Sequence, residues 1–306
     1  MASFPDILVI AGPTASGKTA VGIELAQRLN GEIISADARQ IYRFMDIGTA
    51  KPTTEERAAA RHHLIDFINP DKGYSAGQFA EDASAVIGDI LRRGKVPIVV
   101  GGAGLYIRAL FDGFSPMPKI PIEIRARLQE EGRTCLPALY ERLCEVDPEW
   151  AAKIHPTDTQ RILRGLEVYE ASGKPLSEHQ KVTPTPPIRH KASYFGLHWD
   201  RETLYDRINA RACLMLENGL IEETASLRDR GYTPDLNALN AFGYREIFQY
   251  LNGKTTLDRA LADLQQGTRR YAKRQMTFFR RDKRFRWVDG SDDNVATAIL
   301  QNLETC

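Results

Sequence analysis

Apolar positions along the chain fall into short unbroken runs separated by longer blocks of helical spacing. The clearest runs lie at 6–11, 31–37 and 95–100. Runs of this kind are typical of strands buried on both faces of a parallel sheet. Similar runs predict further strands at 62–68, 192–199 and 285–288. The pattern therefore predicts an α/β fold in which helices flank a parallel sheet.

Helical periodicity occupies the blocks between these runs. Apolar residues recur at helical spacing over 21–29, and an amphipathic helix is expected over 80–93 with Gly94 as its end. The segment 201–230 is predicted to be helical. A basic helix is expected over 268–281, with Tyr271, Phe278 and Phe279 interleaved among its cations.

Two proline-rich seams interrupt the α/β pattern, one at 112–121 and one at 182–191. The stretch between them, 122–181, is helical in pattern throughout. Asp147 before Pro148, and Asp158 further on, are typical helix caps. The chain is therefore predicted to hold a helical insertion at 116–190. The α/β core would then be formed in two parts, 1–115 and 191–306.

A glycine-rich stretch follows the first apolar run. Gly12-Pro13-Thr14-Ala15-Ser16-Gly17-Lys18-Thr19 fits the P-loop pattern, and it stands between a predicted strand and a predicted helix as that motif requires. Its backbone N–H groups and the helix dipole favour an anion. Lys18 adds a charge for a terminal phosphate, and the Thr19 hydroxyl suits a phosphate-bound Mg²⁺. The pattern predicts a P-loop NTPase-like core that binds phosphate, without saying which phosphate.

Two other strand ends are expected to face the same site. Asp37 closes the second strand, where it can serve either in function or as a cap of the next turn. The turn at 101–106 is rich in glycine, and its strand should lie beside the P-loop strand, so that its tip faces the phosphate. Arg207 and Arg211 stand one helical turn apart, either at the phosphate or on a solvated surface.

Composition excludes several classes of protein. The 306 residues are 42% hydrophobic and 26% charged, as in ordinary globular chains, and no apolar run approaches the length of a membrane span. The amino terminus lacks the features of a signal peptide, which favours a cytoplasmic location. The four cysteines show no metal-ligand spacing and are expected as free thiols: Cys135, Cys144, Cys213 and Cys306.

Net charge is only +1, but the segment 269–286 carries nine Lys or Arg and one acid, Asp282. Such a basic region with interleaved aromatics suits RNA, where cations meet phosphates and rings stack on bases. It equally suits an amphipathic helix whose aromatic residues belong to the core.

Taken together, these motifs resemble those of the bacterial-type tRNA dimethylallyltransferases, also called tRNA isopentenylpyrophosphate transferases. The likeness covers nearly the whole chain. The matching segments are the P-loop at 12–19, Ser-Ala-Asp-Ala-Arg-Gln-Ile-Tyr at 35–42, Asp-Ile-Gly-Thr-Ala-Lys-Pro at 46–52, the glycine turn at 100–106, Gln-Arg-Ile-Leu-Arg at 160–164, Ala-Phe-Gly-Tyr-Arg at 241–245 and Lys-Arg-Gln-Met-Thr-Phe-Phe-Arg at 273–280.

The resemblance implies a prenyl transfer. The P-loop would hold the diphosphate of dimethylallyl diphosphate with Mg²⁺. The acceptor would be N6 of the adenosine just 3′ of the anticodon, in a tRNA anticodon stem-loop bound by a monomer. Asp37 would act as base, while Lys18 and Arg211 would stabilise the leaving diphosphate. The tRNA contacts implied are Asp37, Ala38, Arg39, Gln40, Ala103, Arg125, Gln160, Arg161, Ile162, Leu163, Arg164, Gly243, Tyr244, Arg245, Lys273, Arg274, Gln275 and Arg280.

Two positions depart from the family pattern. Ala38 replaces a serine beside Asp37, and Ala103 replaces a threonine in the second glycine turn. Each loses a hydroxyl that could bond to RNA or diphosphate. Two alternatives remain from the residues alone, a P-loop kinase of a small metabolite and a non-catalytic RNA-binding protein. The basic helix speaks against the first, because a small substrate needs no such surface, and Asp37 speaks against the second.

Overall fold

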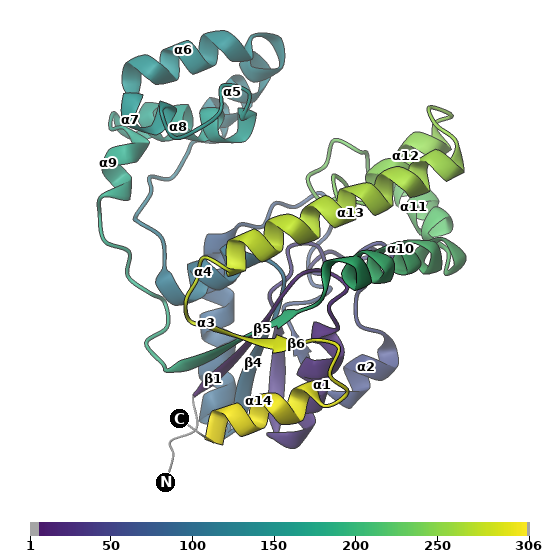
Figure 1. Cartoon of the computed structure of the whole chain (residues 1–306). Helices are drawn as coiled ribbons and strands as arrows, with labels where there is room; N and C mark the ends of the chain where they lie inside the picture. The colour runs from purple at the N-terminus through teal and green to yellow at the C-terminus, as the bar shows by residue number, and fades with distance from the viewer. Residues whose placement is uncertain (1–5, 305–306) are drawn as a thin grey trace. The chain divides into compact units, whose positions relative to one another are not determined.

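The structure is a computed structural model that describes residues 6–304. Among these residues, six parallel strands form one sheet in the order β3-β2-β4-β1-β5-β6 (Figure 1). The expected parallel α/β architecture is confirmed. The strands are β1 (Ile7–Ala11), β2 (Gly31–Ser35), β3 (His62–His63), β4 (Val96–Gly101), β5 (Ala192–His198) and β6 (Phe285–Asp289).

The P-loop strand β1 lies inside the sheet. Ile10 is in register with Val100 of β4 on one side and with Phe195 of β5 on the other. The expectation that β4 lies beside the P-loop strand is therefore confirmed. Because all strands are parallel, the segments that follow β1, β2 and β4 emerge at the same edge of the sheet.

Strand β3 is much shorter than the predicted run at 62–68. Leu64 and Asp66 both have left-handed backbone angles, with φ of 57° and 59°. Residues in this region cannot continue an extended strand. The hydrophobic pattern is therefore real, but the chain turns away after His63.

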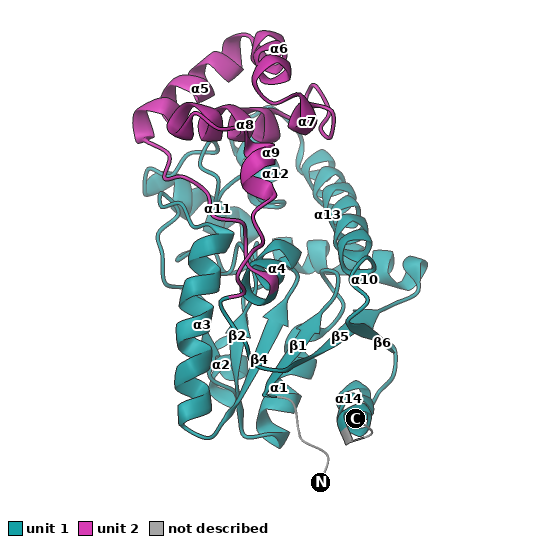
Figure 2. Ribbon diagram, turned by 90° about the vertical axis from the view of Figure 1, so that its left-hand side faces the viewer, with its two compact units in different colours: residues 1–111, 187–306 teal, residues 112–186 magenta. Residues whose placement is uncertain are grey.

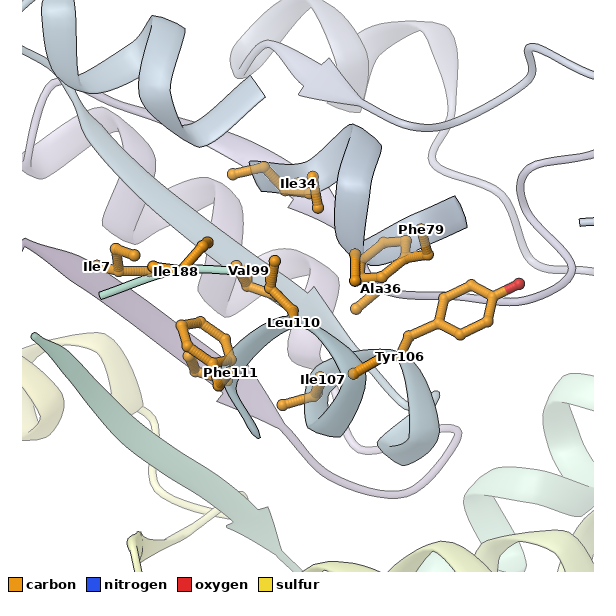
Figure 3. Packing of buried hydrophobic residues seen from close by; sticks show 14 of the residues in the cluster. Ile7, Ile34, Ala36, Phe79, Val99, Tyr106, Ile107, Leu110, Phe111 and Ile188 are labelled. Atoms are coloured by element: carbon orange, nitrogen blue, oxygen red, sulfur yellow. The ribbon is translucent and has the colours of Figure 1, made fainter. Parts of the chain in front are cut away.

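Helices cover both faces of the sheet. On one face, α3 (Ala76–Arg92) and α4 (Gly104–Asp112) pack on Ile7, Val9 and Val99, as Figure 3 shows in part. On the other face, α1 (Lys18–Arg28) and α14 (Val295–Glu304) pack on Leu8 and Ile10. Neighbouring residues of β1 thus alternate between two cores, which explains the unbroken apolar run in the sequence.

Helix α3 begins earlier than the predicted residue 80. Ser75 accepts a hydrogen bond from the Gln78 backbone, and the Gln78 side chain accepts one from the Ser75 backbone, so that the two form a capping box. A short helix on the same part of the chain, α2 (Thr54–Ala59), has the same kind of cap, from Thr53 and Glu56.

A helical lobe follows β5 and has a core of its own. It comprises α10 (Arg201–Glu217), α11 (Leu220–Asp229), α12 (Tyr244–Leu251) and α13 (Leu257–Phe279). The helical prediction over 201–230 is confirmed except for a break at Gly219, whose φ is 98°. Helix α13 is also longer than predicted, since Thr256 caps it twelve residues before Thr268.

Residues 112–186 form a separate compact unit (Figure 2). Its helices are α5 (Ile122–Thr134), α6 (Leu136–Val146), α7 (Pro148–Ala151), α8 (Thr159–Ser172) and α9 (Leu176–Gln180). The caps predicted at Asp147 and Asp158 are confirmed, since each side chain accepts a hydrogen bond from its helix. Both boundaries of the unit lie four residues before the expected 116 and 190.

Two expectations from composition concern the described residues. Cys135, Cys144 and Cys213 are free, whereas Cys306 and the first five residues lie outside the described part. None of the helices within residues 6–304 combines the length and apolar character needed to cross a membrane.

Candidate active site

A cavity of about 570 Å³ opens at the carboxyl edge of the sheet, within the α/β unit. The P-loop forms its floor, and Asp37, the turn after β4 and the two helices α10 and α13 contribute the walls. The residues that matter for the argument are Thr14, Lys18, Thr19, Asp37, Gln40, Gly101, Gly102, Arg207, Arg211, Leu214, Tyr271 and Gln275.

The P-loop is held in a compact curl before helix α1. Ala15 has a left-handed φ of 63°, and Gly17, with φ of 86°, is the residue at which the helix begins. The Lys18 ammonium turns back to donate to the Pro13 carbonyl. This arrangement brings Lys18 and the first turn of α1 together, which is where an anion is expected.

Helix α10 places two arginines on the P-loop. The Arg207 Nε donates to the Ala15 carbonyl at 2.9 Å, and Arg211 donates to the Thr14 hydroxyl. The Trp199 ring lies under Arg207, 4.1 Å from the guanidinium carbon, and the Trp199 N–H donates to the Ser16 carbonyl at 3.0 Å. Both arginines lie against the P-loop, where Arg211 is half-buried and Arg207 remains exposed. The supporting Trp199 was not predicted.

These cations lack carboxylate partners. Within residues 6–304, none of the salt bridges involves Lys18, Arg207 or Arg211. Burial lowers the pKa of Lys18 to about 7; the charge of Arg211 adds to this effect, while Asp37 opposes it. Burial likewise lowers the pKa of Arg211. A site with crowded, desolvated cations is suited to a multiply charged anion.

Asp37 has the capping role that its sequence position allowed, and its catalytic role stays a prediction. Its Oδ1 accepts hydrogen bonds from the backbones of Arg39 at 2.8 Å and Gln40 at 3.2 Å, which is the capping role. Its Oδ2 has no hydrogen-bond partner among the described residues. Because the residue lines the cavity, that second oxygen is available to a ligand. Burial raises the pKa of the nearby Tyr271 to about 12, and the Asp37 charge reinforces the shift.

The loop at 46–51 supports the cavity wall behind Asp37. Gln40 donates to the Ala50 carbonyl at 2.9 Å and accepts from Ser35 at 3.2 Å. The loop itself is held by Glu223 of α11, which accepts from the backbone N–H groups of residues 46, 47 and 48 at 2.9, 2.8 and 3.1 Å. Glu223 was not predicted, since nothing near it in sequence marks this role.

Three of the predicted RNA contacts have buried side chains. Tyr244 is 0% exposed and donates to Glu223 at 2.6 Å. Ile162 is 0% exposed within the core of the helical unit, and Gln275 is 7% exposed. The expectation of RNA contact through the side chains of Tyr244 and Ile162 is therefore corrected. Gln275 lines the cavity, so its contact with RNA stays a prediction. Each of the three lies on the inward face of its helix, whereas a motif match does not separate inward from outward positions.

The remaining candidates of the α/β unit divide between surface and interior. Arg245, Lys273, Arg274 and Arg280 are exposed, whereas Gly243 is buried and Arg39 donates to the Ala238 carbonyl at 3.3 Å. The aromatic residues of the basic helix divide between core and surface, and RNA binding by this helix stays a prediction. Phe279 is a core residue at 1% exposed, while Tyr271 and Phe278 are 36% and 38% exposed.

In the helical unit, Gln160 and Arg161 are exposed at the start of α8. Arg125 and Arg164 flank Glu167, with N···O distances of 3.4 and 3.5 Å. Leu163 is half-buried against the unit's core. The exposed side chains can meet a ligand, and Glu167 fixes the two neighbouring arginines.

The second glycine turn meets the cavity through Gly101 and Gly102. Ala103 instead packs beside the core formed with α3 and α4, as does Ala38. The expectation that position 103 forms the tip facing the phosphate is therefore corrected. The Ala103 backbone N–H donates to the Ala36 carbonyl at 3.0 Å, which turns its side chain toward the core.

The donor set of the cavity is compatible with Mg²⁺. Thr19 and Asp37 offer hard oxygen ligands on the cavity wall. Among the described residues, no group of three or more His, Cys, Asp or Glu side chains could hold a metal ion. A Mg²⁺ ion here would thus take most of its ligands from phosphate oxygens and water, as this ion usually does.

Comparisons with known proteins agree with this arrangement. The family model described as IPP transferase matches residues 40–282. The tRNA dimethylallyltransferase of Acetivibrio thermocellus is 46% identical over 301 residues, which cover 98% of this chain and 96% of that protein. That of Geobacter sulfurreducens is 44% identical over 302 residues, with 98% and 97% covered.

Solved structures show the same likeness. The tRNA isopentenylpyrophosphate transferase of Bacillus halodurans matches with a TM-score of 0.71 and 38% identity, over 98% of this chain and 97% of that one. A eukaryotic dimethylallyltransferase acting on tRNA matches with a TM-score of 0.79 and 30% identity, over 96% of this chain and 77% of that one.

Proposed function

The chain belongs to the tRNA dimethylallyltransferase family, and we propose that it moves a dimethylallyl group from dimethylallyl diphosphate to N6 of the adenosine just 3′ of the anticodon, with release of diphosphate. One observation carries this proposal. The cavity sets three cations without carboxylate partners beside the available oxygen of Asp37. The three cations fit a diphosphate, and the Asp37 oxygen fits an amine that must lose a proton.

The donor half of the site is formed by the P-loop, Gly12 to Thr19, with Arg207 and Arg211. The P-loop N–H groups and Lys18 bind the diphosphate, and Arg211 stabilises the charge that grows on it as the C–O bond breaks. Leu214 and Tyr271, 52% and 36% exposed on the cavity wall, offer apolar surface to the dimethylallyl chain. Mg²⁺ held at Thr19 would further neutralise the diphosphate when bound.

The acceptor half depends on Asp37. The exocyclic amine of adenine is a weak nucleophile, because its lone pair is delocalised into the ring. Asp37 Oδ2 accepts an N–H of that amine, the N6 lone pair forms the bond to the allylic carbon, and the proton passes to the carboxylate. The backbone bonds to Oδ1 hold the carboxylate in place while this occurs.

The RNA is proposed to bind through exposed cations. On the α/β unit these are Arg245, Lys273, Arg274 and Arg280, and on the helical unit Arg161 is a further cation, beside the neutral amide of Gln160. Phosphates require such charges, and an anticodon loop offers unstacked bases that an enzyme can draw into a pocket. The protein is further proposed to act as a cytoplasmic monomer, which sedimentation of the full chain tests.

Label transfer tests the proposal. The full chain is incubated with dimethylallyl diphosphate labelled in the prenyl group, Mg²⁺ and unmodified tRNA, and the tRNA is digested to nucleosides. Label in N6-dimethylallyladenosine from the position after the anticodon is expected. A parallel sample contains ATP and no tRNA. Hydrolysis of ATP in that sample, together with an absence of label in the tRNA of the first sample, would instead indicate the small-metabolite kinase.

A further inference from the structure

A buried glutamine connects the basic helix to the donor half of the cavity. Gln275 lies on the inward face of α13, between the core residues Ala272 and Phe279. An amide at such a position costs free energy unless it is hydrogen-bonded, since water is excluded. With 7% of its surface exposed, Gln275 therefore needs partners inside the protein.

Both ends of the amide have partners, and these belong to two different loops. The Thr14 backbone N–H of the P-loop donates to Gln275 Oε1 at 2.9 Å. Gln275 Nε2 donates to the Gly102 carbonyl, in the turn after β4, also at 2.9 Å. One partner is a donor and the other an acceptor, so the orientation of the amide is determined.

Gly102 is required for this contact. A Cβ at that position would lie 2.2 Å from Gln275 Nε2, and a Cβ at Gly104 would lie 2.3 Å from the Phe278 ring of the same helix. The glycines of the turn thus allow α13 to approach the sheet edge. Part of the glycine pattern that resembled a phosphate-binding turn serves this close packing instead.

Thr14 is consequently held from two helices. Arg211 of α10 donates to its hydroxyl, and Gln275 of α13 accepts from its N–H. In the same turn of α13 as Gln275, Lys273 and Arg274 are exposed on the outer face. The helix proposed to meet RNA on one side is therefore hydrogen-bonded to the P-loop on the other.

We propose that Gln275 is a positioning residue that holds the P-loop against the turn at 101–104. Because of this contact, the affinity of the P-loop for diphosphate depends on whether RNA is bound to the outer face of α13. The inference rests on the proposed function, because it takes RNA as the ligand of Lys273 and Arg274. Such coupling is reciprocal, so donor binding raises RNA affinity by the same factor.

Binding measurements on the full chain test this role without any turnover. The affinity for inorganic diphosphate with Mg²⁺ is measured by calorimetry, with and without a saturating anticodon stem-loop RNA. In the parent, RNA is expected to raise diphosphate affinity on the order of 10-fold. In Gln275→Met, which keeps the length and loses both hydrogen bonds, the ratio is expected to fall to about twofold or less.

The matched control is Gln266→Met, the same change at an exposed position of α13. It should keep the parental ratio, and thermal unfolding should show both variants folded. The inference would be overturned if RNA raised diphosphate affinity in Gln275→Met by the same factor as in the parent, or if RNA did not change diphosphate affinity in the parent. A merely structural role of Gln275 would lower diphosphate affinity equally with and without RNA.

A second pair of variants gives an independent test. Gly102→Ala should weaken diphosphate binding in the parent, because the new Cβ meets Nε2. The same substitution should reduce diphosphate affinity less in a Gln275→Ala background, where Nε2 is absent. An equal loss of affinity in both backgrounds would argue against the contact. Label transfer with no RNA-dependent diphosphate affinity would refute the role of Gln275 alone. RNA-dependent diphosphate affinity without label transfer would refute the proposed function alone.

Discussion

The two ends of the central sheet handle charge in opposite ways. At the carboxyl ends of the strands, Lys18, Arg207 and Arg211 crowd around the P-loop, and none of them forms a salt bridge within the described chain. Burial lowers the pKa of Lys18 to about 7. This end of the sheet carries an excess of cations that only a ligand can neutralise.

At the amino ends, a single buried anion is fully surrounded. Glu32, 1% exposed in β2, accepts hydrogen bonds from Arg93 at 2.5 and 2.8 Å, from Lys95 at 2.8 Å and from His63 at 2.8 Å. The bonds from Arg93, aided by Lys95 and His63, hold the pKa of Glu32 well below its usual range. Both ends contain clustered charges, but only the one whose cations lack carboxylate partners is proposed as a binding site.

The largest effect should follow from Asp37, the carboxylate that follows β2 at the cationic end. Asp37→Asn keeps the shape and the Oδ1 bonds but removes the proton acceptor. Loss of a positioned base is expected to slow transfer by about 10²–10⁴-fold, with RNA affinity little changed. Single-turnover transfer and RNA binding measure the two quantities. A variant with near-parental turnover would refute the assignment of Asp37.

Lysines from the two ends provide a matched pair. Lys18→Ala should lower kcat/KM for dimethylallyl diphosphate by about 10²–10³-fold, because it removes a charge aimed at the leaving group. Lys95→Ala should leave activity unchanged and lower the free energy of unfolding by about 1 kcal/mol. Steady-state kinetics and urea unfolding separate the two. If Lys18→Ala abolished RNA binding instead, the loop would hold the other substrate.

The amino-end cluster should control stability through pH. Because the folded-state pKa of Glu32 is lowered, its contribution is present above its unfolded pKa and is lost as the pH falls below about 4.3. Glu32→Gln should therefore lower unfolding free energy by about 2 kcal/mol at pH 7. The difference from the parent should shrink steadily below pH 4. A difference that stays constant across this range would show that Glu32 stabilises by packing rather than by charge.

The smallest effect concerns the outer face of α13. Charge reversal at Lys273 and Arg274 should weaken RNA binding and reduce its salt slope by about one unit or less per residue. Diphosphate affinity without RNA should not change. The control is Lys254→Glu, an exposed lysine outside the basic stretch. Equal slopes for all three proteins would place the RNA elsewhere.

What the sequence could predict was local. The P-loop with its flanking strand and helix, and the caps at Asp147 and Asp158, each depend on residues a few positions apart. The same holds for the parallel sheet, since its buried strands are continuous apolar runs. Boundaries failed where backbone angles decide them, as at Leu64 and Gly219.

Residues that act through distant partners could not be predicted in this way. Glu223 is bonded to a loop 175 to 177 positions away, and Trp199 reaches Ser16 across 183 positions. Motif resemblance likewise identified Tyr244 and Gln275 but did not predict that both side chains are buried and hydrogen-bonded inside the protein. It marks which residues matter, whereas burial and hydrogen bonds show what they touch.

The ends of the helical unit have a consequence for the history of the chain. Within the unit, Gly113 and Thr185 lie side by side, since a Cβ on Gly113 would be 2.4 Å from the Thr185 carbonyl oxygen. Within the α/β unit, Phe111 and Ile188 share one core (Figure 3). The two ends of the helical unit therefore lie close together, and so do the two ends of the α/β unit that it joins. This is the geometry required of a domain insertion, which a single in-frame event can add or remove. All residues that line the cavity belong to the α/β unit and lie outside the helical unit.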